Sequence, residues 1–145
     1  MSYQLISSGR QIFGGFAAPG YRPGEWSSRS DLVTFLRERM GDREPDGTVV
    51  NVLYIPDQRG AFNAMIAVAR ETPADVPMGD VFVELPPTTY AVFTPDFDLP
   101  DIVEDAWNQV EEAVAAGSLG RGIGTEFEAW TSPSDVEIYL PVLCV

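Results

Sequence analysis

Glu128 has the most unusual chemical surroundings in this sequence. It lies in the run FEAW, directly between Phe127 and Ala129, with Trp130 two positions further on. A carboxylate among apolar and aromatic side chains is costly to bury unless something compensates its charge. Acid beside aromatic rings is also a combination that holds flat organic cations. A solvated sheet surface can show the same residues, and the residues alone slightly favour that second interpretation.

Two alternating runs are expected to place this carboxylate in a β-hairpin. The runs from Phe127 to Trp130 and from Val136 to Leu140 alternate residue types with a period of two, and a turn-rich segment from Thr131 to Asp135 separates them. Alternate residues of a strand point to opposite faces, so one face should be wholly apolar and lie on a core. The apolar face is expected to hold Phe127, Ala129, Val136, Ile138 and Leu140, and the opposite face Glu128, Trp130, Glu137 and Tyr139.

Three further aromatic residues could act as ligand-stacking walls or as ordinary core residues. Trp107 follows Ala106 in an expected helix, next to that helix's apolar stripe. A tryptophan in such a place is most often a core residue whose N–H is hydrogen-bonded. Tyr54 and Trp26 carry the same ambiguity. We rank Tyr54 higher, because an internal repeat would place it where Trp130 lies in the second half.

The elements that must position these residues suggest a duplicated α+β unit. One helix is expected from Ser30 to Met40, with Leu32, Phe35, Leu36 and Met40 as its apolar stripe and Gly41 at its end; a second should begin near Pro100 and end at Gly117. Before the final hairpin, strands are expected over Gln11–Ala17, Thr48–Ile55, Phe62–Ala69, Val81–Pro86 and Thr88–Pro95. Gly14 and Gly15 mark a bulge or a close backbone approach in the first of these strands. The order predicts repeated β-α-β-β units in one antiparallel sheet with the helices on one face.

Length and charge bound the functional classes. At 145 residues the chain is expected to form one domain over residues 1–145, with pseudo-repeats at about 10–70 and 80–143. The net charge of −13 disfavours nucleic acid and anionic membranes as partners. The sequence shows no long apolar run and no charged-then-apolar leader, so we expect a soluble, cytoplasmic protein.

The scarcity of certain residue types excludes several chemistries. Histidine is absent from the sequence, and Cys144 is the only cysteine. A chain of this kind has no histidine general base, no Cys-x-x-Cys metal site and no intrachain disulfide. We therefore expect neither a metal nor a cofactor.

Several short motifs resemble one known family. TTYAVFTP, the Ala106–Trp107 pair, FEAW and VEIYLPV occur in the order and at the spacing of the GyrI-like small-molecule-binding domain. This domain is also the effector-binding domain of AraC-type and BmrR-type regulators. The resemblance covers about residues 80–142. It is weaker in the first half, where the family's tyrosine-rich strand motif is represented only by NVLY, ending at Tyr54.

This resemblance implies a ligand cleft between two repeated halves of a curved antiparallel sheet. Glu128 matches the acidic residue at the base of the family's pocket, and Tyr139 matches a pocket tyrosine. Trp107, Trp130 and Tyr54 are assigned more loosely as pocket walls. Glu137 is left as a secondary acid at the rim of the cleft. The implied ligand is a cationic, lipophilic aromatic molecule.

The resemblance also leaves alternative functions open. Some GyrI-like proteins are associated with hydrolysis of electrophilic toxins, and others inhibit gyrase by protein contact. The sequence shows no basic DNA-binding segment, so it resembles the stand-alone members, and we expect no direct nucleic-acid binding and no membrane partner. Binding without catalysis is the leading hypothesis, with a separate regulatory protein partner left open.

Overall fold

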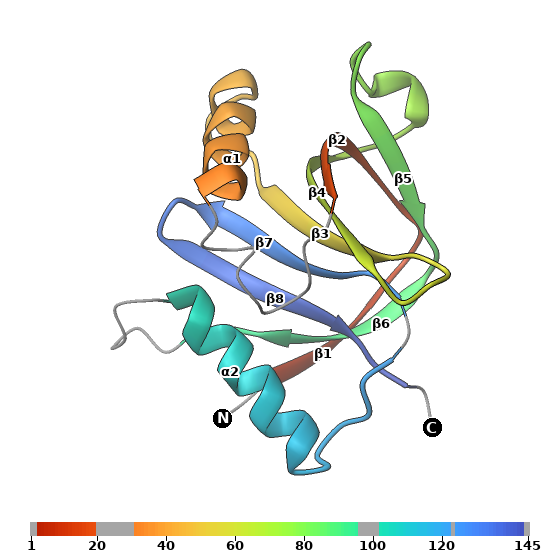
Figure 1. Ribbon diagram of the computed structural model, residues 1–145, viewed down its shortest axis with the longest axis vertical. Coiled ribbons are helices and arrows are strands. Elements are labelled where there is room, and N and C mark those ends of the chain that lie inside the picture. Colours follow the sequence, from red (N-terminus) through yellow and green to blue (C-terminus); the bar gives the residue numbers. More distant parts are fainter. Residues whose placement is uncertain (1–2, 20–30, 96–101, 123, 144–145) are drawn as a thin grey trace.

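The computed structural model describes residues 3–19, 31–95, 102–122 and 124–143. These residues form one eight-stranded sheet with two α-helices and a short 3-10 helix. The elements are β1 (Tyr3–Ser8), β2 (Gln11–Pro19), α1 (Asp31–Arg43), β3 (Val50–Pro56), β4 (Phe62–Arg70), η2 (Pro73–Asp75), β5 (Val81–Leu85), β6 (Thr88–Phe93), α2 (Ile102–Ala115), β7 (Glu126–Ser132) and β8 (Asp135–Pro141). Both helices lie in front of the sheet in Figure 1.

The strand order shows that the two halves of the chain exchange their edge strands. The order across the sheet is β1-β6-β8-β7-β3-β4-β2-β5, and every neighbouring pair is antiparallel. The central pair, β3 and β7, joins the halves, with Val52 directly opposite Glu128. The first strand of each half pairs with the other half, because β1 adds to β6 and β5 adds to β2. Contacts at the centre and at both edges therefore connect the halves.

The predicted α+β class and the repeated, antiparallel arrangement are confirmed, but each repeat contains one more strand than expected. The repeated unit is β-β-α-β-β, with β1 and β5 as leading strands. The strand predicted over Val81–Pro86 corresponds to β5 but was not counted as part of a repeat, and β1 was not predicted. As an edge strand, β1 is largely exposed, and Leu5 keeps 65% of its surface. Its apolar residues therefore show little of the alternation that identifies a half-buried strand.

The end of α2 agrees with the prediction, whereas the end of α1 differs from it. Helix α2 ends at Ala115 and is closed by Gly117, which has a φ of 73°, and the Ser118 amide donates to the Ala113 carbonyl oxygen at 3.1 Å. Helix α1 instead continues through Gly41 to Arg43. The predicted start near Pro100 and the candidate Trp26 lie outside the described residues. Within the described part of the chain, no helix has the length and apolar character that crossing a membrane requires.

The apolar stripe predicted for α1 was right for Met40 and Leu36, which belong to or pack against the core, and wrong for Leu32 and Phe35. Leu32 and Phe35 are 47% and 53% exposed, whereas Val33 and Met40 are the fully buried apolar residues of this helix. The sequence of α1 has apolar residues on more than one side, so periodicity alone could not select the buried one. The correct side is set by packing on β2, β3 and β4.

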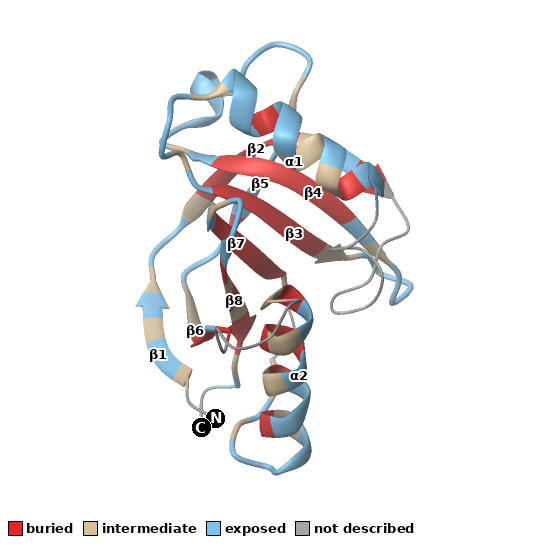
Figure 2. Ribbon diagram, turned by 90° about the vertical axis from the view of Figure 1, so that its left-hand side faces the viewer, coloured by how far each residue is buried: buried red, intermediate tan, exposed pale blue. Residues whose placement is uncertain are grey.

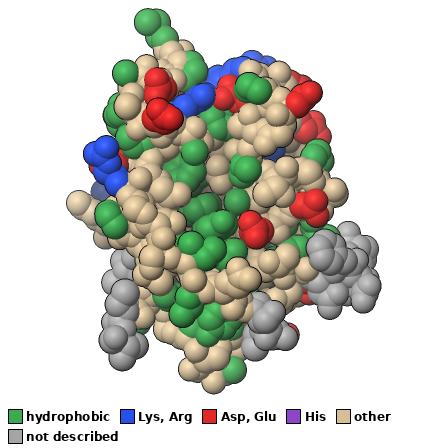
Figure 3. Space-filling view, turned by 180° about the vertical axis from the view of Figure 1, so that it is seen from behind, with side chains coloured by type: hydrophobic (Ala, Val, Ile, Leu, Met, Phe, Trp, Pro, Cys, Tyr) green, Lys and Arg blue, Asp and Glu red, His purple; other side chains and the backbone are tan. Residues whose placement is uncertain are grey.

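The sheet buries residues on both faces. Side chains that point toward the helices, such as Val52, Ile66 and Ile138, form one apolar cluster with α1 and α2. Side chains on the other face, such as Leu53 and Phe127, form a second cluster. In Figure 2 the central strands β3, β4 and β7 are almost wholly buried, whereas β1 is exposed. Figure 3 views the molecule from behind and shows hydrophobic side chains gathered near the middle of the face without helices.

Of the two alternatives predicted for Gly14 and Gly15, a bulge or a close approach, the structure shows the close approach of neighbouring residues. A Cβ atom added to Gly15 would lie 2.0 Å from the Ile66 carbonyl oxygen of the neighbouring strand. One added to Gly14 would lie 2.8 Å from the side chain of Val76. Only glycine lets the chain pass so near, and at Gly15 the obstacle is backbone that cannot easily move.

Candidate ligand-binding site

Strand β7 carries two buried glutamates and a tryptophan on its helix-facing side. Glu126, Glu128 and Trp130 alternate with residues of the opposite face, and all five residues from Glu126 to Trp130 are buried. Glu126 is 6% exposed and Glu128 is 0% exposed. Because β7 lies at the centre of the sheet under the two helices, a carboxylate on this side is surrounded by protein.

The Glu128 carboxylate accepts hydrogen bonds from three aromatic side chains. Its Oε2 accepts from the Tyr54 hydroxyl and from Trp107 Nε1, each at 2.9 Å. Its Oε1 accepts from Trp130 Nε1 at 3.0 Å. Hydrogen bonds to an ionised acceptor are stronger than neutral ones, so these donors offset part of the cost of burying the charge. Strands β3 and β7 and helix α2 each supply one donor.

Glu126 differs from Glu128, because a salt bridge compensates its charge. Arg121 donates from Nε and Nη2 to the two carboxylate oxygens of Glu126 at 2.8 and 2.7 Å, and from Nη1 to Glu111 at 3.2 Å. The hydrogen bonds to Glu126 raise the pKa of Arg121, while burial opposes the rise. A bidentate Arg–carboxylate pair of this kind is a structural link, so Glu128 is the better candidate for ligand contact.

Arg37 of α1 extends toward the same cluster. Its guanidinium carbon lies 3.8 Å from the ring centroid of Trp130, which is a close cation–π contact. Burial lowers the pKa of Arg37, and the negative charge of Glu128 raises it. Trp130 therefore contacts the carboxylate through its N–H and the guanidinium through its ring face.

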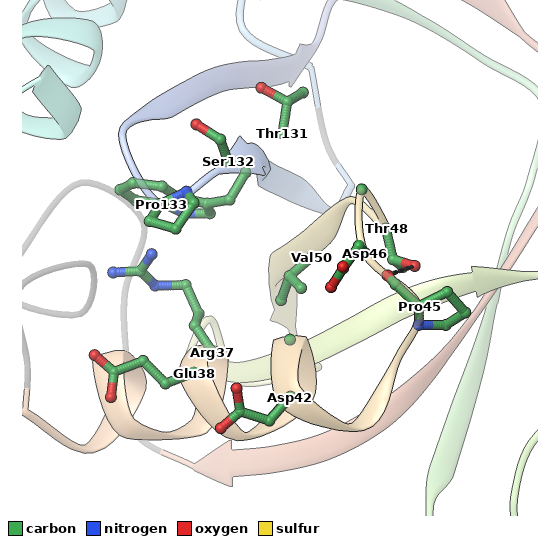
Figure 4. Close-up of a pocket in the computed structure, with 13 residues that line it drawn as sticks. Arg37, Glu38, Asp42, Pro45, Asp46, Thr48, Val50, Thr131, Ser132 and Pro133 are labelled. Carbon is green, nitrogen blue, oxygen red and sulfur yellow. Dashed lines mark hydrogen bonds between the residues drawn. The ribbon is translucent and has the colours of Figure 1, made fainter.

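A pocket of about 470 Å³ lies beside this cluster, between elements of the two halves. Its walls come from α1, from the segment between Pro45 and Val50, and from the β7–β8 turn, and Trp130 and Arg37 belong to its lining. Figure 4 shows Arg37 reaching from α1 toward Pro133 in that turn. Glu38, Asp42 and Asp46 add exposed carboxylates to the lining. Among the described residues, no group of acidic side chains is arranged to hold a metal ion.

No family model matches the sequence, and no curated protein is significantly similar to it. Solved structures are similar. SAV2435, in a structure bound to tetraphenylphosphonium, has a TM-score of 0.77 and 21% identity, covering 99% of this chain and 94% of that one. A putative transcription regulation protein from Staphylococcus aureus MU50 has a TM-score of 0.75 and 18% identity, covering 99% of both chains. The EcmrR C-terminal domain has a TM-score of 0.54 and 16% identity, covering 100% of both.

The chain has the GyrI-like fold. The candidate site lies where the two repeats meet, since Glu128 pairs directly with Val52 across the central strands. Tyr54 and Trp130 lie two residues beyond that pair on their respective strands, so they are equivalent by the internal pseudo-symmetry, as predicted. Only one of the two equivalent central positions carries a carboxylate.

The structure brings together four of the candidate site residues. Tyr54, Trp107, Glu128 and Trp130 meet in one hydrogen-bonded cluster. Tyr139 lies on the opposite face of the sheet. There it stacks on Phe127 with a centroid distance of 4.7 Å and an interplanar angle of 6°. The expectation that Tyr139 shares a face with Glu128 was wrong.

A β-bulge in the hairpin explains this error. Ser132 pairs with Asp135 at the turn, but Trp130 pairs with Val136, so Thr131 is an extra residue in β7. If the register of the Ser132–Asp135 pair continued along both strands, Glu128 would lie opposite Tyr139 and the two faces would be as predicted. With the extra residue, Glu128 faces Ile138. A shift of one residue moves every side chain of a strand to the other face relative to its partner.

The shift also corrects the faces predicted for the remaining hairpin residues. Phe127 and Ala129 share their face with Tyr139 and Glu137, away from the helices. Glu137 is therefore not at the rim of the Glu128 site. The helix-facing side instead combines Glu128 and Trp130 with the apolar residues Val136, Ile138 and Leu140.

Arg37 contacts this cluster but was not predicted from the sequence. A signal for it existed: Arg37 follows Val33 by four positions and precedes Met40 by three, and both of these residues are fully buried. An arginine at that spacing lies on the buried side of a helix. The signal was hidden because the stripe was placed on Leu32 and Phe35.

Proposed function

We propose that this protein binds cationic, lipophilic aromatic small molecules at Glu128, for effector sensing or sequestration. The observation that carries the proposal is the fully buried Glu128 carboxylate, with Tyr54, Trp107 and Trp130 as hydrogen-bond donors. The same aromatic rings that donate to the carboxylate offer faces and edges to a flat or bulky cation. SAV2435, which shares the fold, binds such a cation in its structure.

Physical chemistry favours cations over other ligands of the same size. A carboxylate in apolar surroundings has little competition from water, so a delocalised cation with a low desolvation cost offsets its burial well. Each cation–π contact adds about 0.5–2 kcal/mol. The adjoining pocket of about 470 Å³ is of the size that binds drug-like molecules. The net charge of −13 attracts cations and repels anions.

A pair of isosteric ions tests the proposal directly. Tetraphenylphosphonium and tetraphenylborate have the same shape and opposite charge, so isothermal titration of both separates charge from size. We expect saturable binding of the phosphonium at one per chain and at least about tenfold weaker binding of the borate, since one ion-pair contact of ~1.4 kcal/mol corresponds to tenfold. Equal affinity for the two ions would contradict the proposal.

Matched variants locate the site. Glu128→Gln removes the charge and keeps the shape, and we expect it to weaken phosphonium binding by roughly tenfold or more. Glu137→Gln is the control, because it makes the same charge change one strand away on the opposite face. If the two variants lose affinity equally, the effect is general electrostatics and Glu128 has no special role.

A further inference from the structure

Arg37 is a partly buried cation with one polar atom left unsatisfied. It lies on the side of α1 that packs on the sheet, between Val33 and Met40. Its Nε is buried and has no hydrogen-bond partner among the described residues. The guanidinium is held instead by the ring face of Trp130, at 3.8 Å from the centroid. Such a contact is attractive but leaves the group's hydrogen-bonding capacity partly unused.

The position of Arg37 is the one that the cation of a ligand would take. It lies against the aromatic ring that donates to Glu128, and the charges of Glu128 and Glu38 and the side chain of Tyr54 act on it. Two cations cannot share this position, because like charges in a partly desolvated site repel each other strongly. An external cation next to Glu128 and Trp130 therefore requires that Arg37 leave.

The Arg37 side chain has open space and carboxylates beside it, toward which it can reorient. The pocket of about 470 Å³ opens directly beside its side chain, and Glu38, Asp42 and Asp46 belong to the pocket lining. All three carboxylates are exposed. A long arginine side chain can reorient while its helix stays fixed, and carboxylates at the rim of a pocket stabilise a guanidinium that turns outward.

We propose that Arg37 is an internal competitor: it occupies the cation position on Trp130 in this structure and must turn outward to the exposed carboxylates at the pocket rim before an external organic cation binds at Glu128. This inference rests on the proposed function and adds the element that regulates it. The affinity of the protein for a cation is then the intrinsic affinity reduced by the cost of moving Arg37. A cation whose intrinsic binding free energy is smaller than the cost of moving Arg37 therefore does not bind.

Neutralising Arg37 should therefore tighten binding. We expect Arg37→Gln to raise the affinity for tetraphenylphosphonium roughly tenfold in isothermal titration, because the displaced contact is a partly buried cation–π pair. Arg39→Gln is the matched control, since Arg39 is an exposed arginine of the same helix and does not line this pocket. It makes the same change in net charge, so its effect on affinity should be small.

A conservative variant protects the test against misfolding. Arg37→Lys keeps the charge but loses the planar guanidinium stacked on Trp130, so its affinity should lie between those of the wild type and Arg37→Gln. Circular dichroism and thermal melts of each variant confirm that it is folded before titration. A rank order with Arg37→Gln tightest, Arg37→Lys next, and Arg39→Gln grouped with the wild type supports the inference.

The unfavourable outcomes are distinguishable. If the wild type binds the phosphonium in a Glu128-dependent way and Arg37→Gln binds equally well or more weakly, the inference is overturned and the proposed function stands. If neither the wild type nor Arg37→Gln binds it, both are overturned. If Arg39→Gln tightens binding as much as Arg37→Gln, net charge explains the effect and the specific role of Arg37 is rejected.

Discussion

Removing the Tyr54 hydroxyl should lower the free energy of unfolding, and the size of the loss should depend on the charge of Glu128. The hydroxyl donates to Glu128 Oε2 at 2.9 Å, and both residues are fully buried. Tyr54→Phe deletes this donor and leaves the ring in its edge contact with Trp107, where the centroids lie 6.0 Å apart. A hydrogen bond to a charged group is worth about 1.5–3 kcal/mol, so we expect a loss of about 2 kcal/mol in the free energy of unfolding.

Urea unfolding followed by tryptophan fluorescence measures this loss. For a chain of this size, each 1 kcal/mol lowers the melting temperature by about 2–4 °C, so the expected shift is about 4–8 °C. Tyr3→Phe is the matched control. The Tyr3 hydroxyl donates at 3.0 Å to the carbonyl oxygen of Ser118, in an exposed hydrogen bond to a neutral acceptor. Its removal should cost only about 0.5–1 kcal/mol.

A double-mutant cycle with Glu128→Gln isolates the charged contribution. In the Glu128→Gln background the acceptor is neutral, so Tyr54→Phe should cost about 1 kcal/mol less than in the wild type. Equal costs in the two backgrounds would refute the reasoning, because the hydroxyl would then stabilise something other than the carboxylate. A cost no larger than that of Tyr3→Phe would refute it as well.

Two further predictions concern the sheet itself. Gly15→Ala should lower the free energy of unfolding by about 2–3 kcal/mol or more, because the new Cβ would lie 2.0 Å from the Ile66 carbonyl oxygen. Gly9→Ala is the control for the same urea titration. Because the space around Gly9 is open, this variant should be nearly neutral. Burial raises the pKa values of Tyr90 and Tyr139 above their ordinary 10.0. The folded state then keeps protons that the unfolded state loses, so the free energy of unfolding should fall as the pH rises above about 10. Urea titrations at about pH 9 and 11 check this, and Tyr90→Phe combined with Tyr139→Phe should flatten the dependence; an unchanged slope would contradict it.

Elements with strong local signals were predictable from the sequence. The β-branched run around Val52 predicts a strand because such residues fit a pleated, buried surface, and β3 lies there. Gly117 predicts the end of α2 because glycine adopts the left-handed conformation that closes a helix. Each of these features depends on residues close together in the chain.

Elements whose signal depends on distant partners were not predictable in the same way. Strand β1 exists because β6, from the other half of the chain, provides its hydrogen-bond partners. The buried side of α1 was misassigned because Leu32 and Phe35 are apolar but exposed. Arg121 as the partner of Glu126 also required the structure, since its contact depends on the chain turning back before β7.

For the site, the sequence by itself determined that Glu128 stands in an apolar, aromatic strand, because the alternation and composition of FEAW are local properties. Only the tertiary structure decided which side chains meet its carboxylate. The extra residue Thr131 turns Glu128 away from Tyr139, and helix packing brings Trp107 and Arg37 over it. The physical reason is that strand faces have a period of two, so a bulge of one residue, set by long-range pairing, reverses which partners a buried charge finds.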